Sequence, residues 1–298
     1  MSNKNKGIFF IILSALGFSL MSLFVKLSGD LPSMQKSFFR NLVSLVFAFY
    51  IIKKSKIGFS FKRENLIFFI LRASFGTLGI IFNYYALEHL ILSDATMLNK
   101  LAPFFVIIFS FFILKEKIKI WQGISIIIAF LGSLFIINPN LIIGVLTNNI
   151  PKTNLNSVPA LVGVLSAMCA GVAYTMVRLL SLRGEKGPFI VFFFSCFSCL
   201  AILPFVLFNF SPMSIKQLIY LLLAGLFASL GQFAVTAAYA NAPSKEISIF
   251  DYSQIIFSGI LGYIVFKQKP DVYSFIGYAI ICLVATFMFI MNNKNKQV

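Results

Sequence analysis

The chain has 298 residues, of which 59% are hydrophobic and 11% are charged, and its mean hydropathy is +0.93. A soluble domain carries about 25% charged residues, so this chain cannot cover its surface with polar groups and must have lipid as its solvent. The net charge of +16 does not indicate nucleic-acid binding, because the basic residues lie mostly in short runs between apolar segments. One His, and four Cys that all lie in apolar runs, predict neither a His-based metal site nor a disulfide framework.

Ten apolar stretches follow one another along the chain, each about 20 residues long and able to cross a bilayer as a helix. The first begins after Lys4 and Lys6, as a signal peptide does, but it lacks a convincing cleavage site and is predicted to remain as the first helix. Pro103 and Pro204 fall well inside spans, where they should bend the helix. The predicted spans are 7–28, 34–52, 65–87, 93–114, 118–138, 157–181, 188–209, 214–240, 244–266 and 271–291.

One block of sequence occurs twice, on either side of the longest polar connection. It runs from Tyr85-Ala86 to Leu114-Lys115-Glu116-Lys117 in the first copy, and from Tyr239-Ala240 to Phe266-Lys267-Gln268-Lys269 in the second. Each half holds five helices, an odd number, so the second half must enter the membrane from the opposite side. The sequence therefore predicts an all-α integral membrane protein of ten transmembrane helices, in two inverted five-helix repeats that cover residues 7–138 and 157–291.

The loops differ in their content of Lys and Arg. With the N-terminus in the cytoplasm, the inside segments hold most of these residues, so the positive-inside rule favours cytoplasmic N- and C-termini. The bias comes from the first half, whose second loop contains Lys53, Lys54, Lys56, Lys62 and Arg63, and it nearly vanishes in the second half, where the basic ninth loop lies outside. The abundance of Phe, Ile, Asn and Lys is typical of an AT-rich bacterial genome, so we expect a multi-pass protein of a bacterial inner membrane.

Short motifs recur at corresponding places in the two halves. They are Tyr85-Ala86-Leu87, Ser93-Asp94-Ala95, Leu101-Ala102-Pro103-Phe104, Glu116, Gly123 and Gly132, and then Asp251 to Gln254, Leu261-Gly262-Tyr263, Phe266 to Gln268, Pro270-Asp271 and Gly277. Together with Arg40 on the second helix, they resemble the repeat of the EamA family, in the drug/metabolite transporter superfamily. The halves differ where Gln268 stands opposite Glu116 and Ile255 opposite Pro103.

The resemblance implies a ten-helix carrier. Its central cavity would be lined by helices one, three, four, six, eight and nine, with helices five and ten at the periphery. Members of the family export amino acids and metabolites, or take up nucleotide-like and vitamin-like compounds.

Ionisable side chains inside the predicted spans are costly in lipid, so each is a candidate functional residue. They are Lys26, Arg40, Arg72, Asp94, Lys100, Arg178, Glu246 and Asp251. Four of the cations could instead snorkel to the headgroups: Lys26, Arg40, Arg72 and Arg178. Lys26 or Arg40 could also pair with Asp30. Asp94 and Glu246 occupy equivalent helix starts, where a carboxylate either stabilises the helix or serves as a gate. The coupling and gating candidates are Asp94, Glu246 and Arg40.

Lys100 and Asp251 are the strongest candidates for contact with a substrate or a coupling ion. Aligning Glu116 with Gln268 places Asn99 opposite Asp251, so both polar clusters lie at the same level of the two repeats. The alternative is a structural ion pair between helices four and nine. For the neutral candidates, the alternative is a hydrogen bond to a neighbouring helix. The predicted substrate-binding residues are Lys100, Asn99, Asp251, Tyr252, Gln254, Asn83, Tyr84, Tyr174, Gln232 and Ser22.

These patterns favour a secondary transporter that moves a small polar metabolite, such as an amino acid, by alternating access. The chain has no phosphate-binding GxxxxGK[ST] motif, so an ion or substrate gradient, with proton or ion coupling, is the expected energy source. A membrane-embedded enzyme or a channel is the alternative, but the acidic residues are not clustered as such enzymes require. We expect a monomer or weak homodimer in the lipid bilayer, without cofactor or bound metal.

Overall fold

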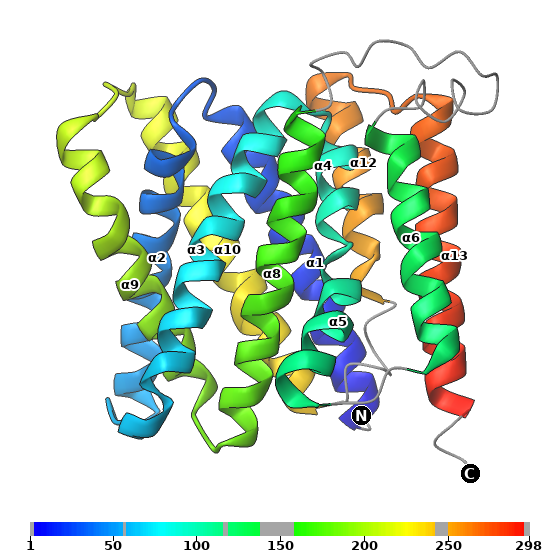
Figure 1. Cartoon of the computed structure of the whole chain (residues 1–298). Helices are drawn as coiled ribbons and strands as arrows, with labels where there is room; N and C mark the ends of the chain where they lie inside the picture. The colour runs from blue at the N-terminus through cyan, green and yellow to red at the C-terminus, as the bar shows by residue number, and fades with distance from the viewer. Residues whose placement is uncertain (1–2, 56–57, 116–118, 138–157, 242–249, 295–298) are drawn as a thin grey trace.

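The computed structural model describes residues 3–55, 58–115, 119–137, 158–241 and 250–294. Over these residues the chain forms helices joined by loops, without a strand (Figure 1). The elements are α1 (Asn3–Leu27), α2 (Ser33–Lys54), the short 3-10 helix η1 (Arg63–Asn65), α3 (Leu66–His89), α4 (Leu92–Asn99), α5 (Ala102–Leu114), α6 (Ile120–Ile137), α8 (Val158–Leu182), α9 (Gly187–Phe208), α10 (Ile215–Asn241), α12 (Ser253–Phe266) and α13 (Val272–Lys294).

The helices agree with the ten predicted spans. In the described part of the chain, seven segments are long and apolar enough to cross a membrane, and α6 and α12 are shorter apolar helices. The remaining span, α2, has 22 residues and carries buried polar side chains in its first half. The prediction of an all-α integral membrane protein with ten transmembrane helices is confirmed.

The fourth span is broken in the middle. It consists of α4 and α5, which end and begin on either side of Lys100 and Leu101. We expected Pro103 to bend a continuous helix, but the break comes before it. Pro103 instead lies in the first turn of α5, where a helix needs no backbone N–H donor.

The ninth span is broken at the equivalent position. Tyr252, which aligns with Lys100, interrupts the helix between Asp251 and the start of α12. The second half has Ile255 in place of Pro103 and still breaks, so proline does not cause the break. The helix break is a feature that both repeats share. Both spans also end alike, on a lysine in the left-handed region, with φ of 55° at Lys115 and 56° at Lys267.

The packing of the helices has two-fold symmetry. The helices of the first half, α1, α2, α3, α4–α5 and α6, correspond in order to α8, α9, α10, α12 and α13. α1 packs along α10, and the equivalent pair, α8 and α3, packs in the same way; α2 lies against α9 and α6 against α13. The pairs α5–α8 and α12–α1 are likewise related. This exchange of equivalent partners is the expected result of inverted repeats.

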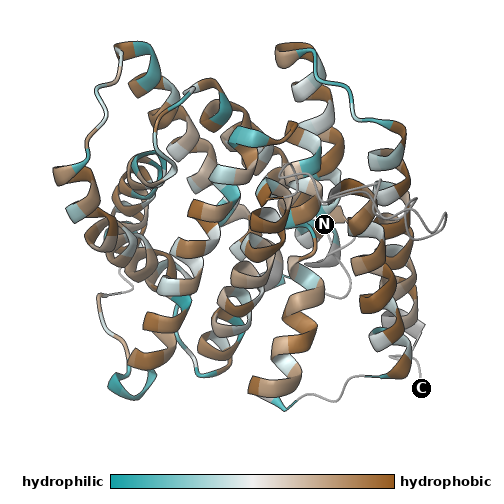
Figure 2. Cartoon of the chain, turned by 45° about the horizontal axis from the view of Figure 1, so that its top comes forward, coloured by the Kyte–Doolittle hydropathy of each residue, from teal (hydrophilic) through white to brown (hydrophobic). Residues whose placement is uncertain are grey.

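The outer surface of the bundle is apolar, as a lipid-facing surface must be. Figure 2 shows hydrophobic residues along the helices and hydrophilic ones mainly at helix ends and loops. Large exposed side chains such as Phe112, Leu207 and Leu283 are each 69% exposed in the isolated chain. α6 and α13 lie side by side at one edge of the bundle (Figure 1), the peripheral place that the resemblance implied for helices five and ten.

Close packing of α1 on α10 depends on two glycines that face each other. Lipid provides no hydrophobic force between helices, so small residues must let the backbones approach closely. A Cβ on Gly17 would lie 2.9 Å from the backbone nitrogen of Gly231 and 3.1 Å from the carbonyl oxygen of Phe227. Neither backbone atom can move without shifting α10.

Gly17→Ala is therefore expected to destabilise the protein, by about 1–3 kcal/mol, which is typical of overpacking. Gly123→Ala is the matched control, because a Cβ on that helical glycine meets nothing within 4 Å. The control should leave stability unchanged or raise it slightly, since alanine is the better helix former. Thermal unfolding of the purified variants in detergent measures both, and equal melting temperatures for the two would contradict the prediction.

Candidate functional site

The two helix breaks meet inside the bundle through an ion pair. The Nζ atom of Lys100 lies 2.5 Å from the Oδ2 atom of Asp251, and the Tyr252 hydroxyl donates a 3.2 Å hydrogen bond to the backbone carbonyl oxygen of Lys100. The Lys100 side chain is 7% exposed and that of Asp251 is 20% exposed. The sequence placed these residues at one level, and the structure brings them into contact, joining the two repeats at their breaks.

Hydroxyl and amide side chains extend this junction to neighbouring helices. The Asn99 amide donates to the Ser166 hydroxyl of α8 at 3.0 Å. A second chain of hydrogen bonds links Thr96 of α4 to Ser258 of α12 at 3.0 Å, and Ser258 to Ser19 of α1 at 3.2 Å. Ser166, Thr96 and Ser258 are not among the predicted site residues, because their only signal in the sequence is a small hydroxyl in an apolar span.

The other neutral candidates divide by their exposure. Ser22, Gln232, Gln254 and Tyr84 are buried, and the Tyr84 hydroxyl has no hydrogen-bond partner among the described residues. Asn83 is half-buried. Tyr174, by contrast, is 36% exposed although it lies within electrostatic reach of Arg40, Arg72 and Asp251. Substrate contact by these neutral residues stays a prediction.

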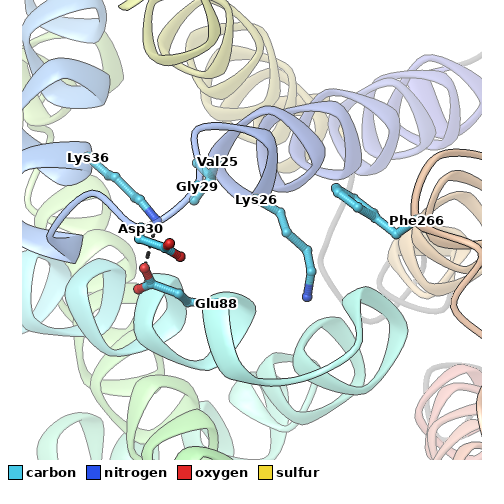
Figure 3. A pocket seen from close by; sticks show the side chains of 7 residues that line it. All are labelled: Val25, Lys26, Gly29, Asp30, Lys36, Glu88 and Phe266. Atoms are coloured by element: carbon cyan, nitrogen blue, oxygen red, sulfur yellow. Dashed lines mark hydrogen bonds and ion pairs between the residues drawn. The ribbon is translucent and has the colours of Figure 1, made fainter. Parts of the chain in front are cut away.

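A second polar cluster lies where α1 ends, α2 begins and α3 ends; we call this the distal end of the bundle, because α1 starts and α13 finishes at the opposite end. Here Lys36 of α2, only 1% exposed, forms a 3.1 Å ion pair with Glu88 of α3, and Ser33 donates to the same carboxylate at 3.3 Å. Figure 3 shows the pair beside Asp30, with Lys26 extending toward the space in front of Phe266. Together with Val25 and Gly29 these residues line a cavity of about 190 Å³.

Lys26 does not snorkel at this end. Its ammonium group donates to the carbonyl oxygen of Leu87 at 2.9 Å and to that of Leu90, the last carbonyls of α3, which no helical N–H reaches. No ion pair between Asp30 and Lys26 or Arg40 occurs in the described residues. The Lys36–Glu88 pair is not among the predicted site residues, because both residues fall at the edges of the predicted spans 34–52 and 65–87.

Asp94 lies in the first turn of α4, close to the distal end. Its carboxylate accepts a hydrogen bond from the Tyr278 hydroxyl of α13. The side-chain oxygen of Gln268 accepts a hydrogen bond from the backbone N–H of Leu92 at 3.1 Å. Gln268, which stands where the first repeat has Glu116, therefore links the end of α12 to the start of α4. Glu246 lies outside the described residues, and a gating role for the carboxylates stays a prediction.

Arg40 and Arg72 are buried inside the protein, so neither takes the alternative of snorkelling to the headgroups. Each is 4% exposed, and each guanidinium lies over the ring of Phe194 on α9, at 5.8 Å for Arg40 and 4.2 Å for Arg72. A charged side chain at the bilayer centre costs about 3 kcal/mol on the insertion scale. A cation–π contact returns about 0.5–2 kcal/mol. The ring therefore offsets only part of the cost of each cation.

Comparison with known proteins adds the decisive observation. The family model described as the EamA-like transporter family matches residues 5–138 and again residues 158–290. The chain belongs to the EamA-like transporter family. Each half of the chain matches the same family model, so the two halves are copies of one unit. This accounts for the duplicated sequence block and the symmetric packing.

Two relatives are named as an exporter and a solute carrier. The pseudopaline exporter CntI of Pseudomonas aeruginosa is 28% identical over 277 residues, covering 92% of this chain and 93% of the relative. Solute carrier family 35 member G1 of Homo sapiens is 28% identical over 291 residues, covering 94% of this chain and 77% of the relative. A solved crystal structure with 13% sequence identity aligns at a TM-score of 0.64 over 97% of this chain and 98% of the other, which shows a shared fold.

Proposed function

We propose that this EamA-like transporter is a secondary transporter that moves a small polar metabolite, such as an amino acid, across a bacterial inner membrane by alternating access. The observation that carries the proposal is the Lys100–Asp251 ion pair at the two helix breaks. In secondary transporters, substrate and ion sites lie near the midplane where discontinuous helices of two inverted repeats meet. An ionisable pair at such a place is by default functional.

The chemistry of this pair suits a cargo that carries both charges. The carboxylate of an amino acid would bind the Lys100 ammonium, and its amino group would bind Asp251. A zwitterion thus replaces the internal ion pair without leaving a charge unpaired in a dry site, which would cost about 3–5 kcal/mol. Exchanging the internal pair for cargo would also loosen the junction between the repeats, and alternating access requires that the repeats move against each other.

The distal end supports the same mechanism. The Lys36–Glu88 pair and the bonds from Lys26 to the end of α3 tie α1, α2 and α3 together on that side, and we propose that these contacts form a gate. In the orientation with cytoplasmic termini, this side faces away from the cytoplasm. Asp94, Glu246 and Arg40 stay our candidates for proton or ion coupling and gating. We further propose that the carrier acts without cofactor and without enzymatic turnover, as a monomer or weak homodimer.

The test has two stages. A thermal-shift screen of the purified protein over amino acids, nucleosides and vitamins identifies a compound that raises the melting temperature. That compound, radiolabelled, is then used in counterflow with proteoliposomes, where a carrier accumulates label against unlabelled internal substrate. A channel gives only equilibration, and an enzyme gives a chemically altered product, so either result would contradict the proposal.

A further inference from the structure

Two buried arginines share one aromatic ring and have no carboxylate beside them. Arg40 comes from α2, Arg72 from α3 and Phe194 from α9, so three helices build the cluster. The Nε atoms of both arginines have no hydrogen-bond partner among the described residues. The Tyr84 hydroxyl lies beside the Arg40 guanidinium. Buried donors of this strength are ordinarily satisfied.

The described carboxylates are engaged elsewhere or lie at helix ends and loops. The ion pairs that the described residues form are Lys36–Glu88 and Lys100–Asp251, so no described carboxylate lies within 4.0 Å of either guanidinium. Asp94 accepts from Tyr278, and Glu185 accepts from Asn65. The polar groups beside Arg40 are neutral: it donates a 2.5 Å hydrogen bond to the amide oxygen of Asn41, and the Tyr84 hydroxyl lies beside it. Two positive charges are thus collected without a negative one.

A glycine on α3 makes room for one of the two cations. A Cβ on Gly76 would lie 2.1 Å from the Nη1 atom of Arg72 and 2.9 Å from the ring of Phe194. The Arg72 guanidinium therefore lies against the bare backbone of its own helix, sandwiched between α3 and Phe194. This position fixes the planar fork of donors, and a guanidinium so held is suited to bidentate recognition of an oxyanion.

We propose that Arg40 and Arg72, held over Phe194 and accompanied by Tyr84, bind one oxyanion of the transported molecule, either a phosphate monoester or a carboxylate other than the one at Lys100. The site offers two positive charges and a phenolic hydroxyl to an anionic group, and no described carboxylate of the protein occupies that place. Tyr174 lies within electrostatic reach of both arginines and of Asp251, which connects the site to the ion pair at the helix breaks. The assignment to the cargo rests on the proposed carrier function, whereas binding itself does not.

The test uses purified protein in detergent with two probes, sodium succinate and glycerol 3-phosphate, each against sodium chloride at equal ionic strength. One probe is expected to raise the melting temperature saturably, and the effective probe identifies the oxyanion as carboxylate or phosphate. Arg40→Gln and Arg72→Gln are expected to weaken the apparent affinity about ten- to hundredfold, since each removes a charged hydrogen-bond donor. Without probe, neither variant should melt earlier, because removing one of two like charges relieves repulsion.

Two matched controls separate binding from general effects. Arg183→Gln removes an arginine that also lies over a ring, Phe68 at 4.5 Å, but at an exposed position; it should bind the probe as the wild type does. Gly76→Ala keeps both charges but displaces the Arg72 guanidinium, and should weaken binding. Gly79→Ala, one turn away, makes only ordinary 3.4 Å contacts and should not.

The proposal is overturned if neither probe stabilises the wild type, or if both glutamine variants retain the shift. It is also overturned if the glutamine variants melt earlier without probe while Gly76→Ala binds normally, because the arginines would then be structural. Failure of counterflow together with arginine-dependent probe binding contradicts the carrier function and leaves the oxyanion site standing. Counterflow that is unaffected in Arg40→Gln and Arg72→Gln contradicts the assignment of the oxyanion to the cargo.

Discussion

Asp251→Asn is expected to abolish counterflow and to destabilise the protein. The substitution leaves the Lys100 ammonium, 2.5 Å away and 7% exposed, without its counter-charge. Removing one partner of a buried ion pair costs about 3–5 kcal/mol, because the remaining charge is still withdrawn from water. A zwitterionic cargo also loses its partner for the amino group, which weakens binding about ten- to hundredfold. Thermal unfolding and counterflow measure the two effects separately.

The double variant Lys100→Met/Asp251→Asn distinguishes a substrate-binding pair from a structural one. Replacing a buried ion pair by uncharged groups is often neutral for stability, so the double variant should recover most of the melting temperature that Asp251→Asn loses. It should nevertheless remain inactive in counterflow. Glu64→Gln, the same chemical change at an exposed carboxylate, should alter neither quantity. Wild-type exchange by the double variant would show that the pair only holds the helices together.

Glu88→Gln is expected to open the distal end. The substitution leaves the Lys36 ammonium, which is 1% exposed, buried without its counter-charge in the conformation described here. A cost of about 3 kcal/mol to one of two conformations shifts their ratio more than a hundredfold. The measurement is alkylation of Val25→Cys by a membrane-impermeant maleimide, because Val25 lines the distal cavity and is 1% exposed here. The alkylation rate should rise strongly in the Glu88→Gln background.

The labelling requires that the four natural cysteines, Cys169, Cys196, Cys199 and Cys282, are first replaced by alanine. Glu185→Gln is the matched control. Glu185 also ties polar groups together, accepting from Asn65 at 2.6 Å and from the backbone of Lys62 at 3.1 Å, but at the opposite end of α3. That variant should leave the rate at Val25→Cys unchanged. An equal rise in both variants would indicate general loosening instead of a distal gate.

The sequence determined the membrane class, the ten spans and the inverted repeat. These follow from local and additive properties: the length of each apolar run fixes a crossing, and an odd number of crossings per repeat fixes inversion. It also placed Lys100 and Asp251 at one level: equivalent positions of inverted repeats lie equally far from the midplane on opposite sides, so they meet when both are near the midplane. The ion pair at the two helix breaks agrees with that placement.

Only the tertiary structure decided which side chains meet. The helix breaks depend on packing between the repeats, so Pro103 gave a misleading local signal and the second half breaks at Tyr252 without a proline. Arg72 lies close enough to the end of α3 to snorkel, but Gly76 and Phe194 provide a place for it inside the protein. The position of a residue along its membrane-spanning helix can be predicted from the sequence. The direction in which its side chain points depends on the neighbouring helices that pack against it.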